Sequence, residues 1–157
     1  MRKRVINRLH SETTVDETRW LDLSRVASVE VTSEDASHPI ESALLTGDAA
    51  GWRASHPGEQ VIRLIFDEPQ QIELIKLLFV EEERARTQQF VLRWMQNNSL
   101  QYQEILRQQY NFGPPDNTQE SETYRTDLAG LVALELSIVP DISGGDARAS
   151  LASLRLA

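Results

Sequence analysis

The side chains that most often do chemistry are few in this sequence and widely spaced. Its histidines are His10, His38 and His56, and no two of them lie four residues apart with a glutamate between, as in zinc proteases. The absence of cysteine excludes a thiolate metal site, a cysteine nucleophile and a disulfide framework. Carboxylates are so frequent that a nearby pair of them decides nothing about acid–base catalysis. The sequence therefore predicts a protein that is not an enzyme.

Arginine carries almost all of the positive charge, because Lys3 and Lys76 are the only lysines. Arginine forks bind carboxylates, phosphates and sugar hydroxyls, although codon bias explains the same preference and is the explanation we favour. The acidic run at residues 81–83 could bind a cation, but such runs are usually solvated faces. We assign this run no role.

Composition limits the classes of partner. The chain has 157 residues, 40% of them hydrophobic, which suits a single domain with its own core. A net charge of −8 opposes nucleic acid or an anionic membrane as the main partner. No stretch has the length of a membrane span or the core of a signal peptide, so we expect a cytoplasmic location. Residues 1–20 have no clear period and are predicted to form an N-terminal arm, with one domain at residues 21–157.

Two apolar runs in the middle of the chain have the pattern of β-strands. In residues 61–66 and 72–80, alternate apolar positions share one face, namely Ile62, Leu64, Phe66, Ile75, Leu77 and Phe79. Asp67-Glu68-Pro69 separates the runs with residues that favour a bend and interrupt a ladder. This pattern predicts two strands that pair with each other through a turn. Alternation at residues 27–31 predicts a further strand, and residues 40–45 predict one helical turn.

Residues 81–110 are ambiguous. They are rich in helix-forming residues and are compatible with two helices that break at Asn97-Asn98. The same pair followed by Ser99 also suits a hairpin turn, and Phe90, Leu92 and Trp94 would share one face of a strand. The family resemblance described below favours the hairpin.

In the last third of the chain, apolar residues again occupy alternate positions. At residues 132–138, apolar side chains alternate with Ala133, Glu135 and Ser137, which predicts a strand with one buried and one polar face. Residues 111–122 contain Gly113, Pro114 and Pro115 and are predicted to form a long loop, while residues 149–156 form a closing strand. Seven or eight short strands without a strand–helix repeat predict an all-β antiparallel sandwich.

In order and spacing, five segments resemble the discoidin family, also called coagulation factor 5/8 type C domains. They are Leu44-Leu45-Thr46-Gly47-Asp48 followed by Trp52, the strands QVIRLIFDEP, QQIELIKLLF and LVALELSIVP, and the terminal ASLASLRL. The resemblance covers roughly residues 26–156 and implies the galactose-binding-like jelly-roll fold. It also implies that ligands bind at the loops at one end of the sandwich.

Members of this family that bind sugars often hold a structural calcium ion at an Asp-Gly-Asp turn. Here Thr46 replaces the first Asp of that turn, and Ser153 replaces a Glu of the last strand, so Asp48 is the only surviving candidate ligand. Calcium usually requires several carboxylate or carbonyl oxygens. We therefore expect no metal and no other cofactor.

The loops that the resemblance assigns to ligand binding carry five candidate residues, His38, Arg53, His56, Arg84 and Arg86. Tyr110 and Phe112 enter another loop, and an aromatic face beside hydrogen-bonding forks suits a sugar ring. Each of these residues is equally well explained as an ordinary loop residue. Trp52 and Trp94 are expected to be in the core rather than in a ligand platform.

Two functions are consistent with these observations. The first is a non-catalytic carbohydrate-binding module, which is the commoner use of the resembled family. The second is an intracellular protein-interaction or scaffold domain of the same fold, which agrees with the missing cysteine pair and calcium ligands. Because a fold does not determine function, the predicted partner is a glycan or a protein, with the glycan slightly favoured.

Overall fold

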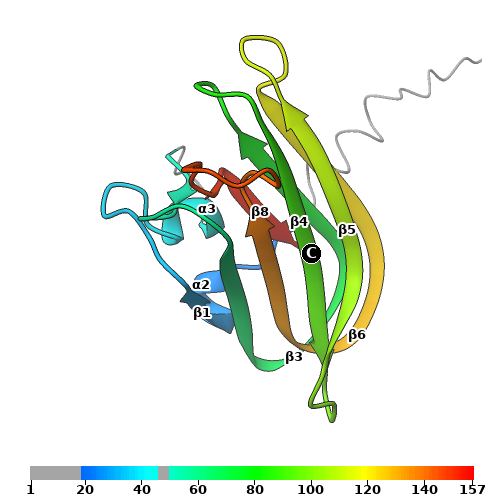
Figure 1. Ribbon diagram of the computed structural model, residues 1–157. Coiled ribbons are helices and arrows are strands. Elements are labelled where there is room, and N and C mark those ends of the chain that lie inside the picture. The colour runs from blue at the N-terminus through cyan, green and yellow to red at the C-terminus, as the bar shows by residue number, and fades with distance from the viewer. Residues whose placement is uncertain (1–18, 46–49) are drawn as a thin grey trace, which may run out of the picture.

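The computed structural model describes residues 19–45 and 50–157 and consists mostly of antiparallel β-structure (Figure 1). Two one-turn helices lie near the start of the described chain, α2 (Leu23–Val26) and α3 (Glu41–Leu44). The strands are β1 (Ala27–Val31), β2 (Trp52–Arg53), β3 (Gln60–Val80), β4 (Arg86–Gln96), β5 (Tyr102–Phe112), β6 (Gln119–Val139), β7 (Ser150–Leu151) and β8 (Ser153–Leu156). The helical turn predicted at residues 40–45 is confirmed by α3.

The long strands β3 and β6 organise the fold. Each has 21 residues, and they pair antiparallel from Gln60 opposite Ile138 to Val80 opposite Gln119. The register shifts between Ile65 and Leu74, so the buried side chains change from even to odd positions along β3. Both apolar runs therefore face the same core, as their alternation predicted.

The prediction that these two runs pair with each other is wrong. They are successive halves of β3, and both halves pair with β6. Pro69 lacks an N–H group and lies where the register shifts, a position at which a missing ladder hydrogen bond is tolerated. The bend at residues 67–69 is thus absorbed within one strand and does not reverse the chain.

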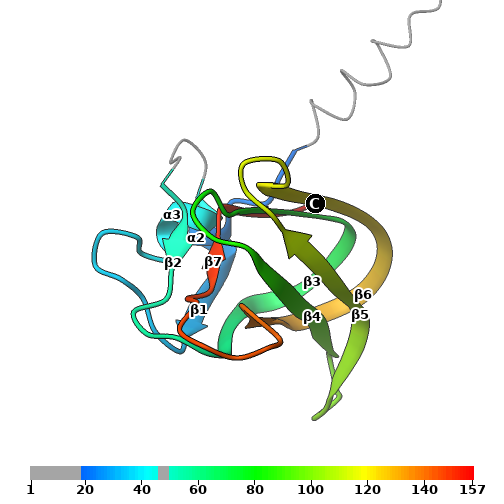
Figure 2. The same cartoon turned by 45° about the horizontal axis from the view of Figure 1, so that its top comes forward.

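The two halves of the paired strands β3 and β6 have different neighbouring strands, so they belong to different walls of the β-sandwich. The main sheet has the order β1-β3-β6-β4-β5, in which β1 pairs with the first half of β3 and β4 pairs with the second half of β6. Beyond the bend, β8 pairs with the second half of β3. Figures 1 and 2 show β3 and β6 curving together across the molecule. The rings of Phe79 and Phe90 meet across the interior with centroids 5.1 Å apart. The predicted antiparallel sandwich is confirmed.

The hairpin predicted within residues 81–110 is also confirmed. Strands β4 and β5 pair from Arg86 opposite Phe112 to Met95 opposite Tyr102, and Asn98 adopts a φ of 70° in the turn. Phe90 and Leu92 are fully buried. Burial of these side chains between two walls outweighs the helical propensity of the segment.

Two predicted boundaries differ from the structure. Strand β6 begins at Gln119, so the predicted loop at residues 111–122 is shorter. The predicted closing strand is two strands, because β7 pairs with β2 whereas β8 pairs with β3. Residues 1–18 of the predicted arm lie outside the described residues. The backbone N–H of Leu21 donates to Leu156 O at 2.8 Å, and the division of the chain at residue 21 stays a prediction.

The outer face of the main sheet carries charges of alternating sign on five neighbouring strands. Glu30, Arg63, Glu135, Arg93 and Glu104 are paired in register across β1, β3, β6, β4 and β5. Arg63 Nε donates to Glu135 Oε2 at 2.8 Å, and Arg93 Nη1 donates to Glu135 Oε1 at 3.3 Å. Glu135 and Ser137 were predicted on a polar face, and they are on it, but the longer arginine side chains leave them buried. We call these five residues the charge ladder.

Gly51 allows the chain to pass close to β7, which generates a prediction. Its φ is +71°, and a Cβ atom there would lie 2.8 Å from the backbone O of Leu151. We expect Gly51→Ala to lower the free energy of unfolding by about 2 to 4 kcal/mol, because backbone strain and a backbone clash add. Gly58→Ala is the matched control, since its φ is +93° but nothing lies within 4 Å of a Cβ. If urea denaturation shows the same decrease in the free energy of unfolding for both variants, the contact between residue 51 and the backbone of Leu151 is not the cause.

Candidate functional site

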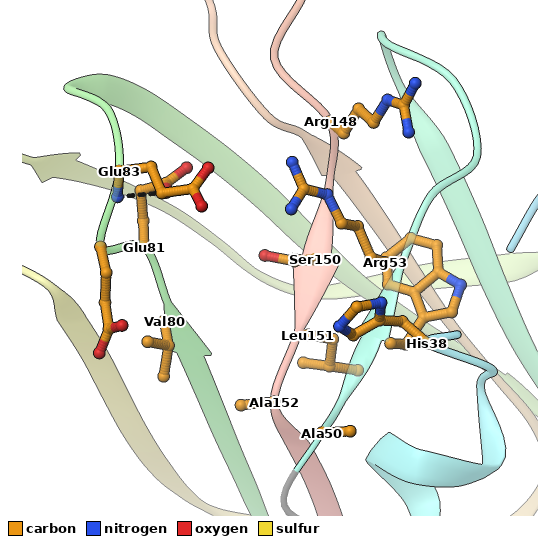
Figure 3. A pocket seen from close by; sticks show the side chains of 12 residues that line it. His38, Ala50, Arg53, Val80, Glu81, Glu83, Arg148, Ser150, Leu151 and Ala152 are labelled. Atoms are coloured by element: carbon orange, nitrogen blue, oxygen red, sulfur yellow. Dashed lines mark hydrogen bonds between the residues drawn. The ribbon is translucent and has the colours of Figure 1, made fainter. Parts of the chain in front are cut away.

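A pocket of about 360 Å³ opens between the short β2–β7 sheet and the segment that follows β3. One side, which we call the donor wall, is formed by His38, Arg53, Arg148 and Ser150. The opposite side, the acidic wall, is formed by Glu81, Glu82 and Glu83. Figure 3 shows Arg53, His38 and Ser150 directed into the space that separates them from Glu81 and Glu83. Val80 and Ala152 add apolar surface.

The pairing of β2 with β7 fixes the donor wall. Trp52 lies opposite Leu151 and is buried, and its Nε1–H donates to Ser33 O at 3.0 Å. Because successive side chains of a strand alternate in direction, the next pair in register, Arg53 and Ser150, faces the pocket. Trp52 was predicted to be a core residue, and this prediction is confirmed.

His38 is held beside Arg53 by a tight turn. The backbone N–H of Arg53 donates to His38 O at 3.2 Å, and the N–H of His38 donates to Asp35 O at 2.8 Å. The carboxylate of Asp35 accepts from the backbone N–H and the hydroxyl of Ser37, and these bonds lower the pKa of Asp35. The turn therefore presents the imidazole at the pocket on a locally hydrogen-bonded backbone.

Arg86 holds the acidic wall from behind. Its Nε donates to Glu81 Oε1 at 2.7 Å, and the other oxygen of that carboxylate accepts from the backbone N–H of Glu83 at 3.1 Å. Burial alone would raise the pKa of Glu81, but the hydrogen bonds from Arg86 and Glu83 lower it below its ordinary value. These hydrogen bonds fix the side chain of Glu81 in the wall. They also occupy part of its capacity to accept hydrogen bonds from a ligand.

The five predicted site residues do not all belong to the pocket. His38 and Arg53 line it, whereas His56 is exposed elsewhere and its ring contacts Ser55 Oγ at 3.1 Å. Arg84 is exposed and donates to Asp146 at 2.8 Å. The prediction that Arg86 contacts a ligand is wrong, because its side chain is fully buried and reaches the site only through Glu81.

Sequence reasoning missed Arg148 and Ser150 and gave residues 81–83 no role. No local pattern identifies Arg148, since its position depends on β7 lying beside β2, about 100 residues distant in the chain. Among the described residues, the guanidinium groups of Arg53 and Arg148 form no ion pair within 4.0 Å. The acidic run could have been noticed as the end of a strand, where side chains border a loop cluster.

The predicted aromatic contact is not part of this pocket. Phe112 is buried at the end of β5, where the guanidinium of Arg86 lies 4.7 Å from its ring centroid. Tyr110 packs on Phe112 edge to face with centroids 4.9 Å apart. Both residues therefore belong to strand β5 and contribute to its packing, and neither lies in a binding loop.

No group of three or more metal-ligating side chains occurs within residues 19–45 and 50–157. Asp48, the candidate calcium ligand, lies outside the described residues, so the expected absence of calcium stays a prediction. In the same described ranges, no helix has both the length and the apolar character that a membrane span requires.

A buried polar chain continues behind Arg86. Its Nη1 donates to Gln88 Oε1 at 3.1 Å and to Pro140 O at 2.9 Å, and Gln88 Nε2 donates to Glu120 Oε1 at 3.1 Å. Glu120 is 1% exposed. Burial, together with the neighbouring carboxyl of Glu122, raises the pKa of Glu120 to about 7. The pocket wall is therefore connected to a core carboxyl that ionises near neutral pH.

Several solved structures that resemble this chain are carbohydrate-binding modules. The family 32 module of NanJ from C. perfringens, in complex with galactose, has a TM-score of 0.64 and 14% identity and covers 87% of this chain and 96% of its own. The family 32 module of AlyQ, in complex with 4,5-unsaturated mannuronic acid, has a TM-score of 0.62 and 14% identity, with 89% and 98% coverage. These identities show a shared jelly-roll fold.

A structure of a different class has the same fold. Reduced XRCC1 bound to the catalytic domain of DNA polymerase β gives a TM-score of 0.58 at 14% identity and covers 85% of this chain and 95% of its own. Comparisons with protein-family models and with curated proteins find no match. The comparisons therefore show the fold of this chain, an antiparallel jelly-roll β-sandwich.

The raised pKa of Glu120 predicts how stability depends on pH. In the unfolded chain this carboxyl ionises near its ordinary pKa of 4.5, whereas in the folded chain it does so near 7. Between these values the folded protein binds more protons, so the free energy of unfolding falls as pH rises through this window. Glu120→Gln should remove this decrease and exceed the wild-type stability at about pH 8 by about 1 to 3 kcal/mol.

Urea denaturation of wild type and Glu120→Gln across this pH range is the measurement. Glu104→Gln is the control, because Glu104 is an exposed carboxylate that pairs with Arg107 at 2.9 Å. Wild-type and Glu120→Gln curves that run parallel across the window would contradict the raised pKa.

Proposed function

We propose that this domain is a non-catalytic carbohydrate-binding module and that its ligand occupies the pocket between the donor wall and the acidic wall. The observation that carries the proposal is the opposition of hydrogen-bond donors and acceptors across a cavity of about 360 Å³. The fold shared with several carbohydrate-binding modules supports it.

The chemistry of the two walls matches the chemistry of a sugar. Each sugar hydroxyl can donate one hydrogen bond and accept others, so it can bridge a guanidinium or hydroxyl on one side and a carboxylate on the other. Arg53 and Ser150 supply donors, and Glu83 supplies an acceptor across the space. Val80 and Ala152 offer apolar surface to the C–H face of the ring.

The same arrangement favours binding without hydrolysis. Glycosidases place two carboxyl groups on either side of the scissile bond, one as acid and one as base or nucleophile. The carboxylates of this pocket all come from residues 81–83 and lie on one wall, while the opposite wall carries cations. The domain would therefore hold a glycan without cleaving it.

The second candidate is a protein-interaction domain of the same fold. The observation that favours it is the resemblance to XRCC1, which was solved in complex with another protein. The charge ladder would be an alternative contact surface for such a partner, because it is an array of charged side chains on the outer face of the main sheet.

We expect replacement of pocket residues to remove glycan binding without unfolding the domain. In a glycan array followed by titration calorimetry, Arg53→Ala and His38→Ala should each weaken binding about tenfold or more, because each removes a donor to the ligand. The melting temperature should change little, as is usual for surface substitutions. His56→Ala is the matched control, since this histidine is exposed and does not line the pocket.

Other outcomes would change the conclusion. A blank array together with a partner protein that binds the purified domain would favour the protein-interaction function. Glycan binding that survives Arg53→Ala and His38→Ala but is lost in Glu30→Ala or Arg93→Ala would move the site to the charge ladder.

A further inference from the structure

The acidic wall of the pocket is one end of a continuous hydrogen-bond chain that runs into the core. The backbone N–H of Glu83 donates to Glu81, which accepts from Arg86 Nε at 2.7 Å. Arg86 Nη1 donates to Gln88 at 3.1 Å, and Gln88 donates to Glu120 at 3.1 Å. Every link between Glu81 and Glu120 is a side chain that is buried or nearly so.

Two atoms of this chain are buried without a partner. They are Nη2 of Arg86, which is a donor, and Oε2 of Glu120, which is an acceptor when the carboxyl is ionised. A buried polar atom without a hydrogen-bond partner costs free energy. Each of these two atoms would therefore be stabilised by moving toward a suitable partner. Arg86 contacts the carboxylate of Glu81 directly, and Gln88 links Arg86 to a second carboxyl, that of Glu120.

We propose that Arg86 is a positioning residue shared between Glu81 at the pocket and Glu120 in the core, so that the charge on Glu120 sets how firmly the acidic wall is held. This inference rests on the proposed function for its effect on binding, but the coupling itself does not require a ligand. Arg86 touches no ligand and acts only through Glu81.

The surroundings of Glu120 determine the direction of the effect. The groups near it are Arg86 and Gln88 of β4, Glu122 and Tyr124 of β6, and Tyr110, which pairs with Gln88 from β5. Burial, and after it the hydrogen bond and charge of Glu122, oppose ionisation of Glu120, and the resulting pKa of about 7 places the change within an accessible range. The hydroxyl of Tyr124 is buried without a partner, and burial raises its pKa, so it stays neutral in this range.

When Glu120 is neutral, Glu81 is the stronger acceptor for Arg86, and the acidic wall is held in place. When Glu120 ionises, it attracts the same guanidinium, and the hydrogen bond to Glu81 weakens. The pocket should therefore be best ordered below about pH 7 and looser above it.

The first experiment detects this coupling without a ligand. The amide proton of Glu83, which donates to Glu81, reports on that carboxylate, so its NMR chemical shift should change with an inflection near pH 7 in the wild type. In Glu120→Gln, which keeps the acceptor for Gln88 but cannot ionise, the inflection should vanish. In Glu104→Gln it should persist. A Glu83 shift that is flat near pH 7 in the wild type, or an inflection unchanged in Glu120→Gln, overturns the proposal.

The second experiment measures binding of an array-selected glycan at about pH 6 and about pH 8. Wild-type affinity should fall about threefold to tenfold over this range, which corresponds to weakening one charged hydrogen bond. In Glu120→Gln this fall should be smaller. If no glycan binds but the Glu83 inflection depends on Glu120, the coupling stands and the proposed function fails. If glycans bind with the same pH dependence in both proteins, the coupling to affinity is refuted and the proposed function stands.

Discussion

The antiparallel ladder between β3 and β6 is the constraint on which the rest of this structure depends. Its 21-residue strands are too long to remain in one wall of a small domain, and the register shifts between Ile65 and Leu74 let both strands turn together. Each half then recruits its own neighbours, β1 and β4 on one side of the bend and β8 on the other. Apolar residues from both halves meet in one core, so neither wall could bury its inner face without the other.

This arrangement also explains why a polar cluster lies inside the sandwich. The chain leaves β3 at Val80, and β4 begins at Arg86, so the connection must cross one end of the interior. Arg86 closes that end by stacking on Phe112 and by bonding Glu81, Gln88 and the carbonyl of Pro140. An apolar side chain would fill the space but would leave the carboxylate of Glu81 without its buried partner. The same residue thus holds the acidic wall in place and packs the end of the core.

Much of the fold could be predicted from the sequence because it depends on local alternation. The strands at residues 61–66 and 72–80, and the turn at Asn97-Asn98, follow from side-chain period and turn chemistry. The local sequence does not determine whether residues 61–66 and 72–80 form a hairpin or one bent strand. That choice depends on β6, whose pairing with β3 spans up to about 80 residues of chain.

The candidate site was less predictable than the fold. His38 and Arg53 were predicted because they lie in loops at which the resembled family binds ligands, and both line the pocket. Arg86 was misplaced because a charged residue in a polar stretch resembles a surface residue, and only the three-dimensional packing of Phe112, Gln88 and Glu81 shows that it is enclosed. Arg148 and Ser150 enter the site through the pairing of β7 with β2, for which the sequence contains no local signal.

The hydrogen bond from Leu21 to Leu156 has a consequence for how this domain can be combined with others. It brings the two ends of the described fold to one place, beside the second half of β3. A domain whose chain enters and leaves at the same point can be inserted into a surface loop of a host protein without pulling the ends of that loop apart. For the same reason, a short linker between these ends would allow the chain to be reopened elsewhere, for example at the Asn97-Asn98 turn, with its strand order in space unchanged.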